Sequence, residues 1–407
     1  MSRREPHCPH FAQRRRRSGA ARRPAAPLLA GLVAGVLAAA VVGFVPAAAA
    51  PAPVVAAVAA PVVDDPLGPD RLPACAGIVA AMTPRERLAQ RLMVGVDVGD
   101  PVAAAQTVRS TQVGGIFLPG NETALLEDQA VRALQAGARI PVAVAVDDEG
   151  GRVQRIDMLD GDLPSAREMS SLTVDEVRVL AEERGRRLAA RGVTLNLAPT
   201  VDLGGQPAGA VIGDRSFGTD PDTVTRYARA FAEGMAAADV GSVVKHFPGH
   251  GRADGDSHAG RVTTPSLDDL RAADLRPYAD LVGPGAPLAG GTTGVMVGHL
   301  DVPGLTDGLP TSLTPAAYAL LREEYGFDGL VVTDDLGAMK AITGEFELPE
   351  AVRTALDAGA DMALWSNPDD PDAVLDVLEP ALAAGTLDPT ANEAAVTRVL
   401  RAKRVCS

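Results

Sequence analysis

The chain has 407 residues, of which 46% are hydrophobic and 22% charged, so it can bury a substantial core and is not a disordered protein. Residues 1–50 hold eight arginines and one acidic residue, which leaves 30 basic and 51 acidic side chains in residues 51–407. A domain this acidic repels phosphate backbones, so we expect no nucleic-acid partner. Three cysteines are too few for a disulfide framework or a cysteine-rich zinc site.

Residues 1–50 have the pattern of an export signal. Six arginines within residues 14–23 precede an apolar run at 28–45, and proline followed by four alanines at 46–50 supplies small residues for a signal peptidase. We therefore expect a cleaved signal peptide and an exported protein, extracellular or associated with the cell wall. The alternative is an uncleaved membrane anchor, because the apolar run is near the lower length limit for crossing a bilayer.

The composition then changes from a linker to a folded domain. Residues 51–70 are rich in Ala, Pro and Val and are interpreted as a linker, which places the folded domain at 71–407. Cys75 and Cys406 lie at the two ends of this domain. In an oxidising compartment they could form a disulfide that joins the chain ends; two unrelated thiols are the alternative.

Short apolar runs rich in β-branched residues recur eight times along the domain, separated by stretches such as 177–190, 221–237 and 349–358 that have helical periodicity. Most runs lack strict alternation, as strands buried on both faces do. Eight such units predict an α/β fold, a single (β/α)8 TIM barrel. A doubly wound sheet is the alternative, but no glycine pattern for phosphate follows the first strand. The predicted strands are residues 92–96, 115–118, 142–146, 193–197, 242–246, 295–300, 330–333 and 362–365.

Charged and polar residues stand at the carboxyl end of nearly every predicted strand. In a barrel this end carries the active site, so the pattern predicts a polar pocket there. The residues are Asp97, Asp147 with Asp148 and Glu149, Asn196, Lys245 with His246, His299 with Asp301, and Asp334 with Asp335.

The stretch 245–258 holds three of the six histidines of the chain, and its proline and glycines predict an irregular, mobile loop. One interpretation is a loop that carries an acid/base histidine, with Asp256 orienting the imidazole. The alternative is a metal site, although the spacing matches no common zinc signature and Lys245 would repel a cation. Its ligands would be His246, His250, Asp256 and His258.

Two further stretches carry candidate chemistry. Asp334 ends a buried strand, where a carboxylate must be hydrogen-bonded, paired or catalytic, and a fixed carboxylate can trap an oxocarbenium-like centre covalently. A helix N-cap is the alternative, and two consecutive aspartates allow both roles, with Asp335 near the cap. In residues 147–155, carboxylates and arginines are suited to sugar hydroxyls, whereas an internal salt bridge of Arg152 or Arg155 is the alternative.

Five motifs stand out, most of them at or near the ends of predicted strands: VDDEGGRVQR at 146–155, GDRSFG at 213–218, KHFPGHG at 245–251, DSH at 256–258 and TDDL at 333–336. Together they resemble glycoside hydrolase family 3, specifically its single-domain β-N-acetylglucosaminidases. They occur in the order of the family, and the resemblance extends from about residue 75 to 404. One departure is Arg252-Ala253, where the family often has Asp-Thr.

The resemblance implies a TIM barrel and a retaining, double-displacement mechanism. It implies that Asp334 is the nucleophile and that His258, assisted by Asp256, is the acid/base on the loop after the fifth strand. Larger relatives carry a second domain with a carboxylate acid, and we expect the histidine loop to take that role here. The implied sugar-binding residues are Asp147, Arg155, Arg215, Lys245 and His246.

We therefore expect an exported exo-β-N-acetylglucosaminidase that releases N-acetylglucosamine from the non-reducing end of peptidoglycan fragments, as a monomer without metal or cofactor. The alternatives are a β-glucosidase or β-xylosidase of the same superfamily, a catalytically silent wall-binding barrel, and a metal-dependent hydrolase. Trp365, at the end of the eighth strand, is expected either to stack on a sugar or to lie in the core.

Overall fold

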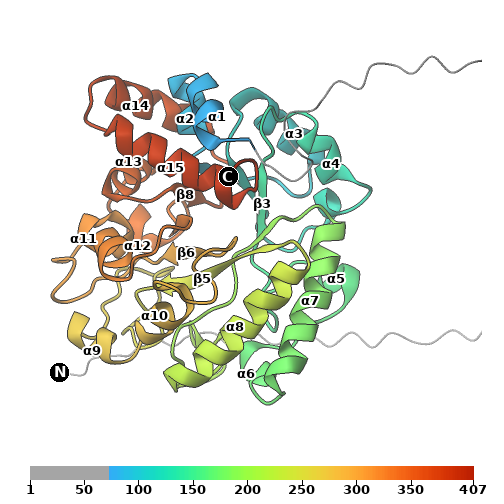
Figure 1. Cartoon of the computed structure of the whole chain (residues 1–407), viewed down its shortest axis with the longest axis vertical. Coiled ribbons are helices and arrows are strands. Elements are labelled where there is room, and N and C mark those ends of the chain that lie inside the picture. The colour runs from blue at the N-terminus through green and yellow to red at the C-terminus, as the bar shows by residue number, and fades with distance from the viewer. Residues whose placement is uncertain (1–72) are drawn as a thin grey trace, which may run out of the picture. The chain divides into compact units, whose positions relative to one another are not determined.

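The computed structural model describes residues 73–407, in which eight parallel strands pair in chain order and close into a barrel (Figure 1). The predicted (β/α)8 fold is confirmed, and each predicted strand is present. The sixth strand ends three residues earlier than predicted, and the seventh extends two residues further. The strands are β1 Leu92–Gly95, β2 Gly115–Phe117, β3 Ala143–Val146, β4 Leu195–Asn196, β5 Gly241–Phe247, β6 Gly294–Val297, β7 Val331–Asp335 and β8 Met362–Trp365.

The expected signal peptide or anchor at 1–50 and the linker at 51–70 lie outside the described residues, so both stay predictions. Within residues 73–407, no helix is both long enough and apolar enough to cross a membrane.

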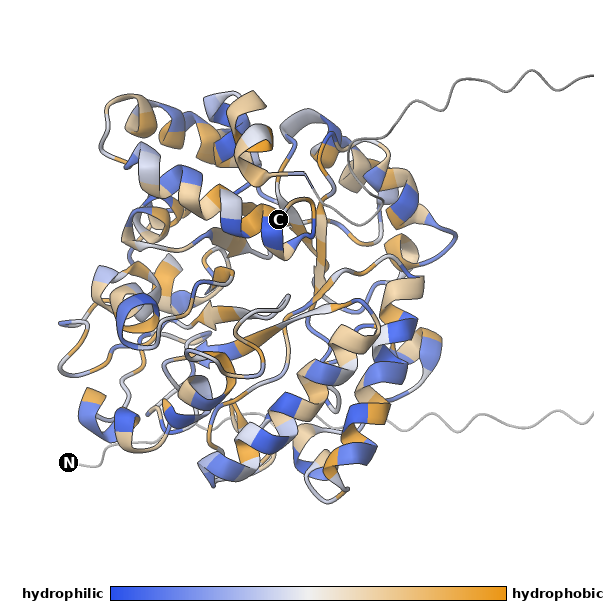
Figure 2. Ribbon diagram, viewed as in Figure 1, coloured by the Kyte–Doolittle hydropathy of each residue, from blue (hydrophilic) through white to orange (hydrophobic). Residues whose placement is uncertain are grey.

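Helices surround the barrel and alternate hydrophilic with hydrophobic residues along their length (Figure 2). Their starts follow from capping residues: the Thr173 side chain accepts from the Glu176 amide, and Asp220 accepts from the Thr223 amide. The helices are α1 Cys75–Ala81, α2 Pro84–Ala89, α3 Pro101–Thr111, η1 Ala124–Leu126, α4 Ala130–Gln135, α5 Asp157–Asp160, α6 Ala166–Met169, α7 Val174–Ala190, η2 Gly213–Arg215, α8 Pro221–Ala237, α9 Leu267–Ala272, α10 Arg276–Val282, η3 Thr311–Leu313, α11 Pro315–Ala319, η4 Leu320–Glu324, α12 Lys340–Thr343, α13 Leu348–Ala358, α14 Pro371–Ala383 and α15 Pro389–Ala402.

Helices α7 and α8 pack closely against each other. A Cβ atom at Gly234 of α8 would lie 2.4 Å from the carbonyl oxygen of Arg178 in α7, so this position requires glycine. The close approach buries the inner faces of both helices, and α8 also packs against β5, the strand that precedes the predicted active-site loop.

Alternation along the strands decides which side chains enter the barrel. In β7, Val332 belongs to the apolar cluster inside the barrel, whereas Val331 packs in the cluster formed with the helices. The same alternation directs Asp334, two residues after Val332, into the barrel at its carboxyl end. In β5, Val243 is inside, and Lys245 follows it in the same way. Because side chains alternate along the strands, these charged groups lie at the mouth of the barrel, above an interior that is otherwise apolar.

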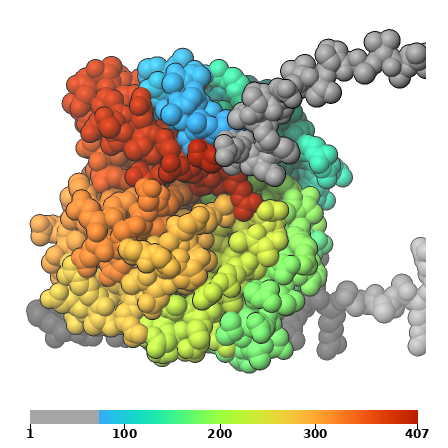
Figure 3. Space-filling view, viewed as in Figure 1, coloured from blue at the N-terminus to red at the C-terminus, as the bar shows by residue number. Residues whose placement is uncertain are grey.

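The two ends of the described chain are joined. Cys75 in α1 and Cys406 after α15 form a disulfide, with their Cα atoms 5.0 Å apart, so the predicted pairing is confirmed. Helix α1 packs against α15, and α2 packs against α14 and α15. Figure 3 shows the resulting junction, where the first described helices lie beside the C-terminal helices on the surface.

Candidate active site

A cavity of about 430 Å³ opens at the carboxyl ends of the strands, which is where the sequence predicts the active site. Its wall contains all eight residues predicted for catalysis and sugar binding. These residues are Asp147, Arg155, Arg215, Lys245, His246, Asp256, His258 and Asp334.

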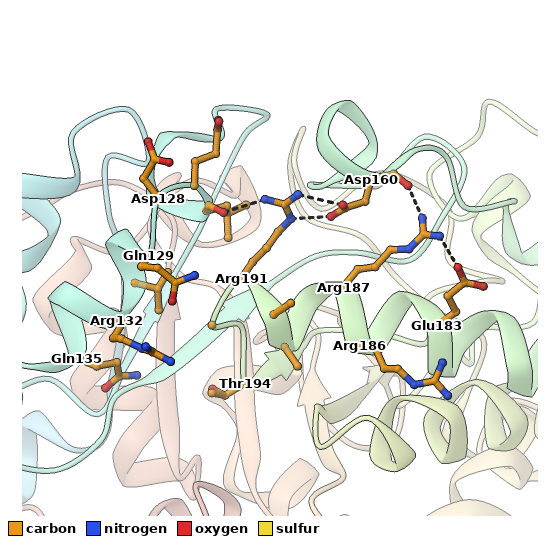
Figure 4. A pocket seen from close by; sticks show the side chains of 16 residues that line it. Asp128, Gln129, Arg132, Gln135, Asp160, Glu183, Arg186, Arg187, Arg191 and Thr194 are labelled. Atoms are coloured by element: carbon orange, nitrogen blue, oxygen red, sulfur yellow. Dashed lines mark hydrogen bonds and ion pairs between the residues drawn. The ribbon is translucent and has the colours of Figure 1, made fainter. Parts of the chain in front are cut away.

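A larger hollow of about 780 Å³ lies on the barrel wall, between α4 and the end of α7 (Figure 4). Two of its arginines are engaged by neighbouring groups. Arg191 Nε lies 2.6 Å from Asp160 Oδ2, and Arg187 contacts Glu183 and the carbonyl oxygen of Asp160. The hollow also reaches Thr194, which precedes β4 and is therefore at the opposite end of that strand from the polar cavity. Position and pairing both favour the barrel mouth as the active site.

Asp334 lies at the end of β7 and is 6% exposed. Its Oδ1 accepts a hydrogen bond from the Asp335 amide at 2.9 Å, whereas Oδ2 has no hydrogen-bond partner in the described part of the chain. Burial alone would raise the pKa of Asp334, but the nearby His246, His299 and Lys245 outweigh it and lower the pKa below its usual value. Asp334 is therefore an ionised carboxylate with one oxygen free to react.

Asp335 has a different environment. Its Oδ1 accepts from the amides of Gly337 at 2.8 Å, Ala338 at 3.1 Å and Ser366 at 3.1 Å. These bonds fix the loop that follows β7 and tie it to the end of β8. Asp335 thus holds the turn after β7 and has a different role from Asp334, but it is not a helix N-cap, because Met339 is the N-cap of α12.

Lys245 is enclosed by carboxylates. Its Nζ lies 2.5 Å from Asp147 Oδ1 and 2.6 Å from Glu149 Oε1, and Arg215 binds both oxygens of Glu149 at 2.7 Å. Burial would raise the pKa of Glu149, but Arg215 and Lys245 outweigh it and hold the pKa well below its usual value. Burial would lower the pKa of Lys245, which Asp147 and Glu149 instead raise. Glu149 and Lys245 therefore face each other as an anion and a cation.

Glu149 was recognised in the sequence as a strand-end residue but was not assigned to the site. The family motifs did not place Glu149 among the sugar-binding residues, yet its side chain is 3% exposed and bridges two predicted sugar-binding cations. Its partners lie 66 and 96 positions away in the sequence, so only the fold reveals the bridge.

Arg155 and Arg152 serve different purposes. Arg155 Nε is buried and, among residues 73–407, has no hydrogen-bond partner, while its amide donates to Asp148 Oδ2 at 2.9 Å. Arg152 Nε donates to Asp214 at 2.8 Å and holds the adjoining loop, as the salt-bridge alternative expected. Asp148 itself is buried and paired with Arg184 at 2.7 Å, so it supports the loop from below.

His246 is oriented by Asp202, a residue that the sequence did not single out. His246 Nδ1 donates to Asp202 Oδ2 at 2.6 Å, and Asp202 Oδ1 accepts from the His250 amide at 2.6 Å. With Nδ1 directed to Asp202, Nε2 is the ring nitrogen that faces the cavity side, and it lies 3.4 Å from Arg215 Nη2. Asp202 lies six residues beyond β4, outside the strand-end positions. In the sequence, the one indication of its role was that Asp202 is the single acidic residue of this apolar segment. In the structure, Thr200 of the same segment forms a bridge with Lys245 of β5.

His258 and Asp256 lie on the loop after β5, at the rim of the cavity. His258 Nδ1 donates to Asp256 Oδ1 at 2.9 Å, and the His258 amide donates to the same oxygen at 2.9 Å. The side chain of His258 is 60% exposed. Burial would raise the pKa of Asp256, but its bonds from the His258 amide and ring outweigh it and lower the pKa. The imidazole is thus held at one nitrogen, and Nε2 faces away from this carboxylate.

The histidines of this stretch have separate partners. His246 is bonded to Asp202, His258 to Asp256, and His250 Nε2 lies 3.3 Å from Ser257 Oγ. In the part of the chain that the structure describes, no group of three or more His, Cys, Asp or Glu side chains is arranged to hold a metal ion.

Arg252, at the departure from the family pattern, ties the loop to the protein. Its Nε donates to Asp274 Oδ2 at 2.8 Å, and Nη2 donates to the carbonyl oxygen of Asp269 in α9 at 2.8 Å. The substitution therefore adds an anchor outside the cavity and leaves the Asp256–His258 pair in place.

Several strand-end residues are structural. Asp97 is exposed and binds the Gly99 amide at 2.9 Å, and Asn196 exchanges hydrogen bonds with the backbone of Asp148. His299 is buried between Ser312 Oγ at 2.7 Å and the Asp335 carbonyl oxygen at 2.9 Å.

Aspartate 301 and tryptophan 365 also lie outside the cavity wall. Asp301 Oδ1 accepts from Thr306 Oγ1 at 2.8 Å and from the Gly308 amide at 3.1 Å. Trp365 is fully buried in the core between barrel and helices. The expectation that it lies in the core is therefore confirmed, and the alternative that it stacks on a sugar is wrong. The apolar wall of the cavity consists instead of residues that no motif indicated. They include Phe117, Met296, Met339 and Leu364.

Comparisons with known proteins agree with this geometry. The family model for the "Glycosyl hydrolase family 3 N terminal domain" matches residues 83–402. Beta-hexosaminidase LpqI of Mycobacterium tuberculosis is 49% identical over 336 residues, which cover 81% of this chain and 84% of that protein.

Solved structures give the same result. M. tuberculosis LpqI superposes with a TM-score of 0.77 at 49% identity, covering 82% of this chain and 97% of the other. A glycosyl hydrolase of family 3 from Mycobacterium smegmatis superposes with a TM-score of 0.76 at 48% identity, covering 80% of this chain and 98% of the other. A β-N-acetylhexosaminidase from Beutenbergia cavernae superposes with a TM-score of 0.71 at 29% identity, covering 80% of this chain and 100% of the other.

Proposed function

The chain belongs to glycosyl hydrolase family 3 and is a glycoside hydrolase; from this we propose that it is a retaining exo-β-N-acetylglucosaminidase, a β-N-acetylhexosaminidase by class. It removes N-acetylglucosamine from the non-reducing end of short oligosaccharides, through a covalent glycosyl intermediate on Asp334. The names of its relatives, which are β-hexosaminidases, support this choice of sugar.

The observation that carries the mechanism is the free Oδ2 atom of Asp334. This oxygen is buried at the cavity and lacks a partner in residues 73–407, while the lowered pKa keeps the carboxylate ionised. Such an oxygen attacks the anomeric carbon, and the glycosidic bond breaks as the new bond forms. The resulting glycosyl ester is later attacked by water, which restores the carboxylate and the configuration of the sugar.

His258 is the acid/base in this proposal. In the first step the protonated imidazole gives a proton to the leaving oxygen, and in the second step the neutral imidazole takes one from the attacking water. The Asp256 carboxylate at His258 Nδ1 favours the charged ring and leaves Nε2 for the transfer. The ring lies exposed at the rim, so the His258 side chain turns inward when a sugar is bound.

The charged groups at the barrel mouth hold the sugar ring. Asp147 and His246 Nε2 can accept hydroxyl protons, whereas Lys245 and Arg215 donate to hydroxyl oxygens. Arg155 Nε, a buried donor that the described residues leave unused, adds a further contact to the sugar.

Peptidoglycan fragments are the proposed substrates. An exported enzyme that removes N-acetylglucosamine meets this sugar in the cell wall, and the predicted signal at residues 1–50 supports that location. We propose action as a monomer on disaccharides or muropeptides that fit a cavity of about 430 Å³.

The test compares nitrophenol release from the N-acetylglucosaminide, the glucoside and the xyloside. We expect the N-acetylglucosaminide to be strongly preferred, and preference for the glucoside or xyloside would favour the alternative activity. Incubation with a disaccharide of N-acetylglucosamine and N-acetylmuramic acid, with and without phosphate, should release N-acetylglucosamine of retained configuration. A sugar phosphate as product would change the proposed acceptor from water to phosphate, and absence of turnover would support a silent wall-binding barrel.

A further inference from the structure

We propose that Asp202, His250 and Ser257 form a buried chain of contacts that positions the acid/base loop relative to the sugar-binding His246. The proposal rests on the proposed function, because it takes His258 as the acid/base. The three residues touch no reacting atom in this scheme and are positioning residues.

Asp202 connects the sugar-binding site to the base of the loop. One carboxylate oxygen accepts from the ring of His246 at 2.6 Å, and the other accepts from the amide of His250 at 2.6 Å. Asp202 is 1% exposed, and burial would raise its pKa, but the ring of His246 and the hydrogen bond from the His250 amide outweigh burial and lower it. A buried, ionised carboxylate with these contacts fixes the distance between the two histidines.

The loop base is also clamped sterically. A Cβ atom at Gly251 would lie 1.8 Å from the carbonyl oxygen of Leu203, the residue after Asp202. The backbone after His250 is therefore pressed against the segment that contains Asp202, which leaves this end of the loop little freedom to move.

His250 then reaches the far end of the loop through its ring. His250 Nε2 lies 3.3 Å from Ser257 Oγ, and both residues are buried, at 3% and 2% exposure. Ser257 stands between the two members of the acid/base pair, whose side chains are 42% and 60% exposed. The Ser257 side chain is thus buried between two side chains that are exposed at the cavity mouth, and its contact with His250 holds the loop at this point.

A second contact holds the same residue from the opposite side. The Ala341 amide in α12 donates to the carbonyl oxygen of Ser257 at 3.0 Å, and Ser257 Oγ lies 3.8 Å from Met339 Sδ. Helix α12 follows the strand that carries Asp334. Ser257 is therefore fixed between the sugar-binding side and the nucleophile side of the cavity.

His250 is suited to this task because it stays neutral. Burial lowers its pKa, and the neighbouring His246 lowers it further, against the opposing effect of Asp202. A neutral imidazole offers one donor and one acceptor nitrogen, so it can bond a hydroxyl without competing for the catalytic proton.

The proposal predicts a selective defect. Removing the Ser257 hydroxyl leaves Asp256 and His258 chemically intact but loosens their position. Steps that need proton transfer to the leaving group should slow, whereas cleavage of substrates with strongly activated leaving groups, which need little protonation, should not.

The experiment is a double-mutant cycle with Ser257→Ala, His258→Ala and the double variant. Each is assayed on a dinitrophenyl N-acetylglucosaminide, whose leaving group is activated, and on an N-acetylglucosamine disaccharide, whose leaving group is poor. We expect Ser257→Ala to lower kcat/KM on the disaccharide about ten-fold and to change the activated substrate little. In the His258→Ala background, Ser257→Ala should have no further effect on the disaccharide.

Ser242→Ala is the matched control. Ser242 is a buried serine of β5 whose hydroxyl has no partner among the described residues, so the same substitution there should leave both substrates unaffected. His250→Gln and His250→Ala form the second pair, because the glutamine amide can still reach the Ser257 hydroxyl. We expect His250→Gln to retain more disaccharide activity than His250→Ala, at comparable melting temperatures.

The outcomes separate this proposal from the proposed function. Additive losses in the cycle, or equal losses on both substrates from Ser257→Ala, would overturn the positioning chain while leaving His258 as acid/base. If His258→Ala alone failed to distinguish the two substrates, the acid/base assignment would be overturned, and the positioning chain with it.

Discussion

Lys245 and Glu149 meet at the mouth of the barrel, with Nζ 2.6 Å from Oε1, and both side chains are almost completely buried. Lys245 also binds Asp147, and Glu149 also binds Arg215. Two anions and two cations are thus linked in one row. Because Lys245 and Glu149 each bind two partners of opposite charge, the row is held in place before any sugar arrives. Preorganisation of this kind reduces what the enzyme must reorder during binding.

Glu149→Gln should therefore impair sugar binding although Glu149 itself is not among the predicted sugar contacts. Arg215 would lose a bidentate charged partner, worth about 1.5–3 kcal/mol, so kcat/KM should fall roughly ten-fold to a hundred-fold, mostly through KM. Steady-state kinetics on the nitrophenyl N-acetylglucosaminide measures this. Glu183→Gln, which removes a carboxylate paired with Arg187 in the wall hollow, is the matched control and should leave kcat/KM unchanged. Equal effects of the two substitutions would argue against a special role of the charged row.

Asp334→Asn should abolish turnover almost completely, because the amide keeps the shape of the side chain but cannot form the glycosyl ester. We expect a loss of at least about a thousand-fold in kcat. A fluorinated N-acetylglucosamine derivative with a good leaving group should label the wild-type protein, and peptide mass analysis should place the label on Asp334. A label on Asp335, together with an active Asp334→Asn variant, would contradict the assignment.

The barrel and its charged mouth could be predicted because both depend on local sequence patterns. Asp147 directly follows β3, whereas Lys245 and Asp334 lie near the carboxyl ends of β5 and β7. The period of two that buries the preceding apolar residues also directs these side chains inward. The orienting role of Asp256 was inferred from the composition of the histidine-rich loop, and the choice of His258 as the acid/base came from the family motifs.

What could not be predicted depends on contacts between distant segments. Asp202 is six residues past its strand, and only the packing of that segment against β5 brings it to His246. Glu149 was visible at a strand end, but its pairing with Arg215 spans 66 positions. Trp365 is the last residue of β8. Side chains alternate between the two faces of this strand, and Trp365 points outward, so it lies among the helices rather than in the cavity.

Arg155→Lys tests the unused guanidinium donor. Lysine keeps the charge but lacks the Nε–H group, which is buried without a partner in residues 73–407. We expect KM to rise about ten-fold with a smaller change in kcat, because a ground-state contact to the sugar is lost. Arg191→Lys, at an ion pair with Asp160 on the barrel wall, should alter the melting temperature at most. If Arg155→Lys had wild-type kinetics, Arg155 would leave the set of sugar-binding residues.

The Cys75–Cys406 disulfide should stabilise the domain without affecting catalysis. It closes a loop with a sequence separation of 331 residues, and neither cysteine lines the cavity. Loss of such a link costs about 2–5 kcal/mol of unfolding free energy in typical cases. Denaturation of the wild type with and without reductant should show this difference. The Cys75→Ser, Cys406→Ser double variant should be equally sensitive in both conditions and retain kcat; reductant that left the wild type unchanged would show that the bond contributes nothing.

Lys403 should destabilise the folded protein at neutral pH, and the effect should fade as the pH rises. Its Nζ contacts only Gln90 Oε1 at 2.5 Å and the Gly114 carbonyl oxygen at 3.4 Å, and no carboxylate within residues 73–407 pairs with it. Burial lowers the pKa of Lys403 to about 7. An unfolded lysine has a pKa of about 10.4, so between these values the unfolded state holds a proton that the folded state has released. Folding therefore becomes more favourable as the pH rises through this interval, and below pH 7 the unfavourable burial of the charge is fully present.

The test is Lys403→Met, which fills the same space without a charge. The variant should be more stable than the wild type at pH 6.5, and its advantage should shrink toward pH 10, because the wild type gains stability there and the variant lacks this proton release. Urea denaturation of both proteins at several pH values measures the difference, in which groups common to both proteins cancel. Lys340→Met, at an exposed lysine at the start of α12, is the matched control. An advantage of Lys403→Met that stayed constant from pH 6.5 to 10, or that matched the control, would show that Lys403 does not lose its proton on folding.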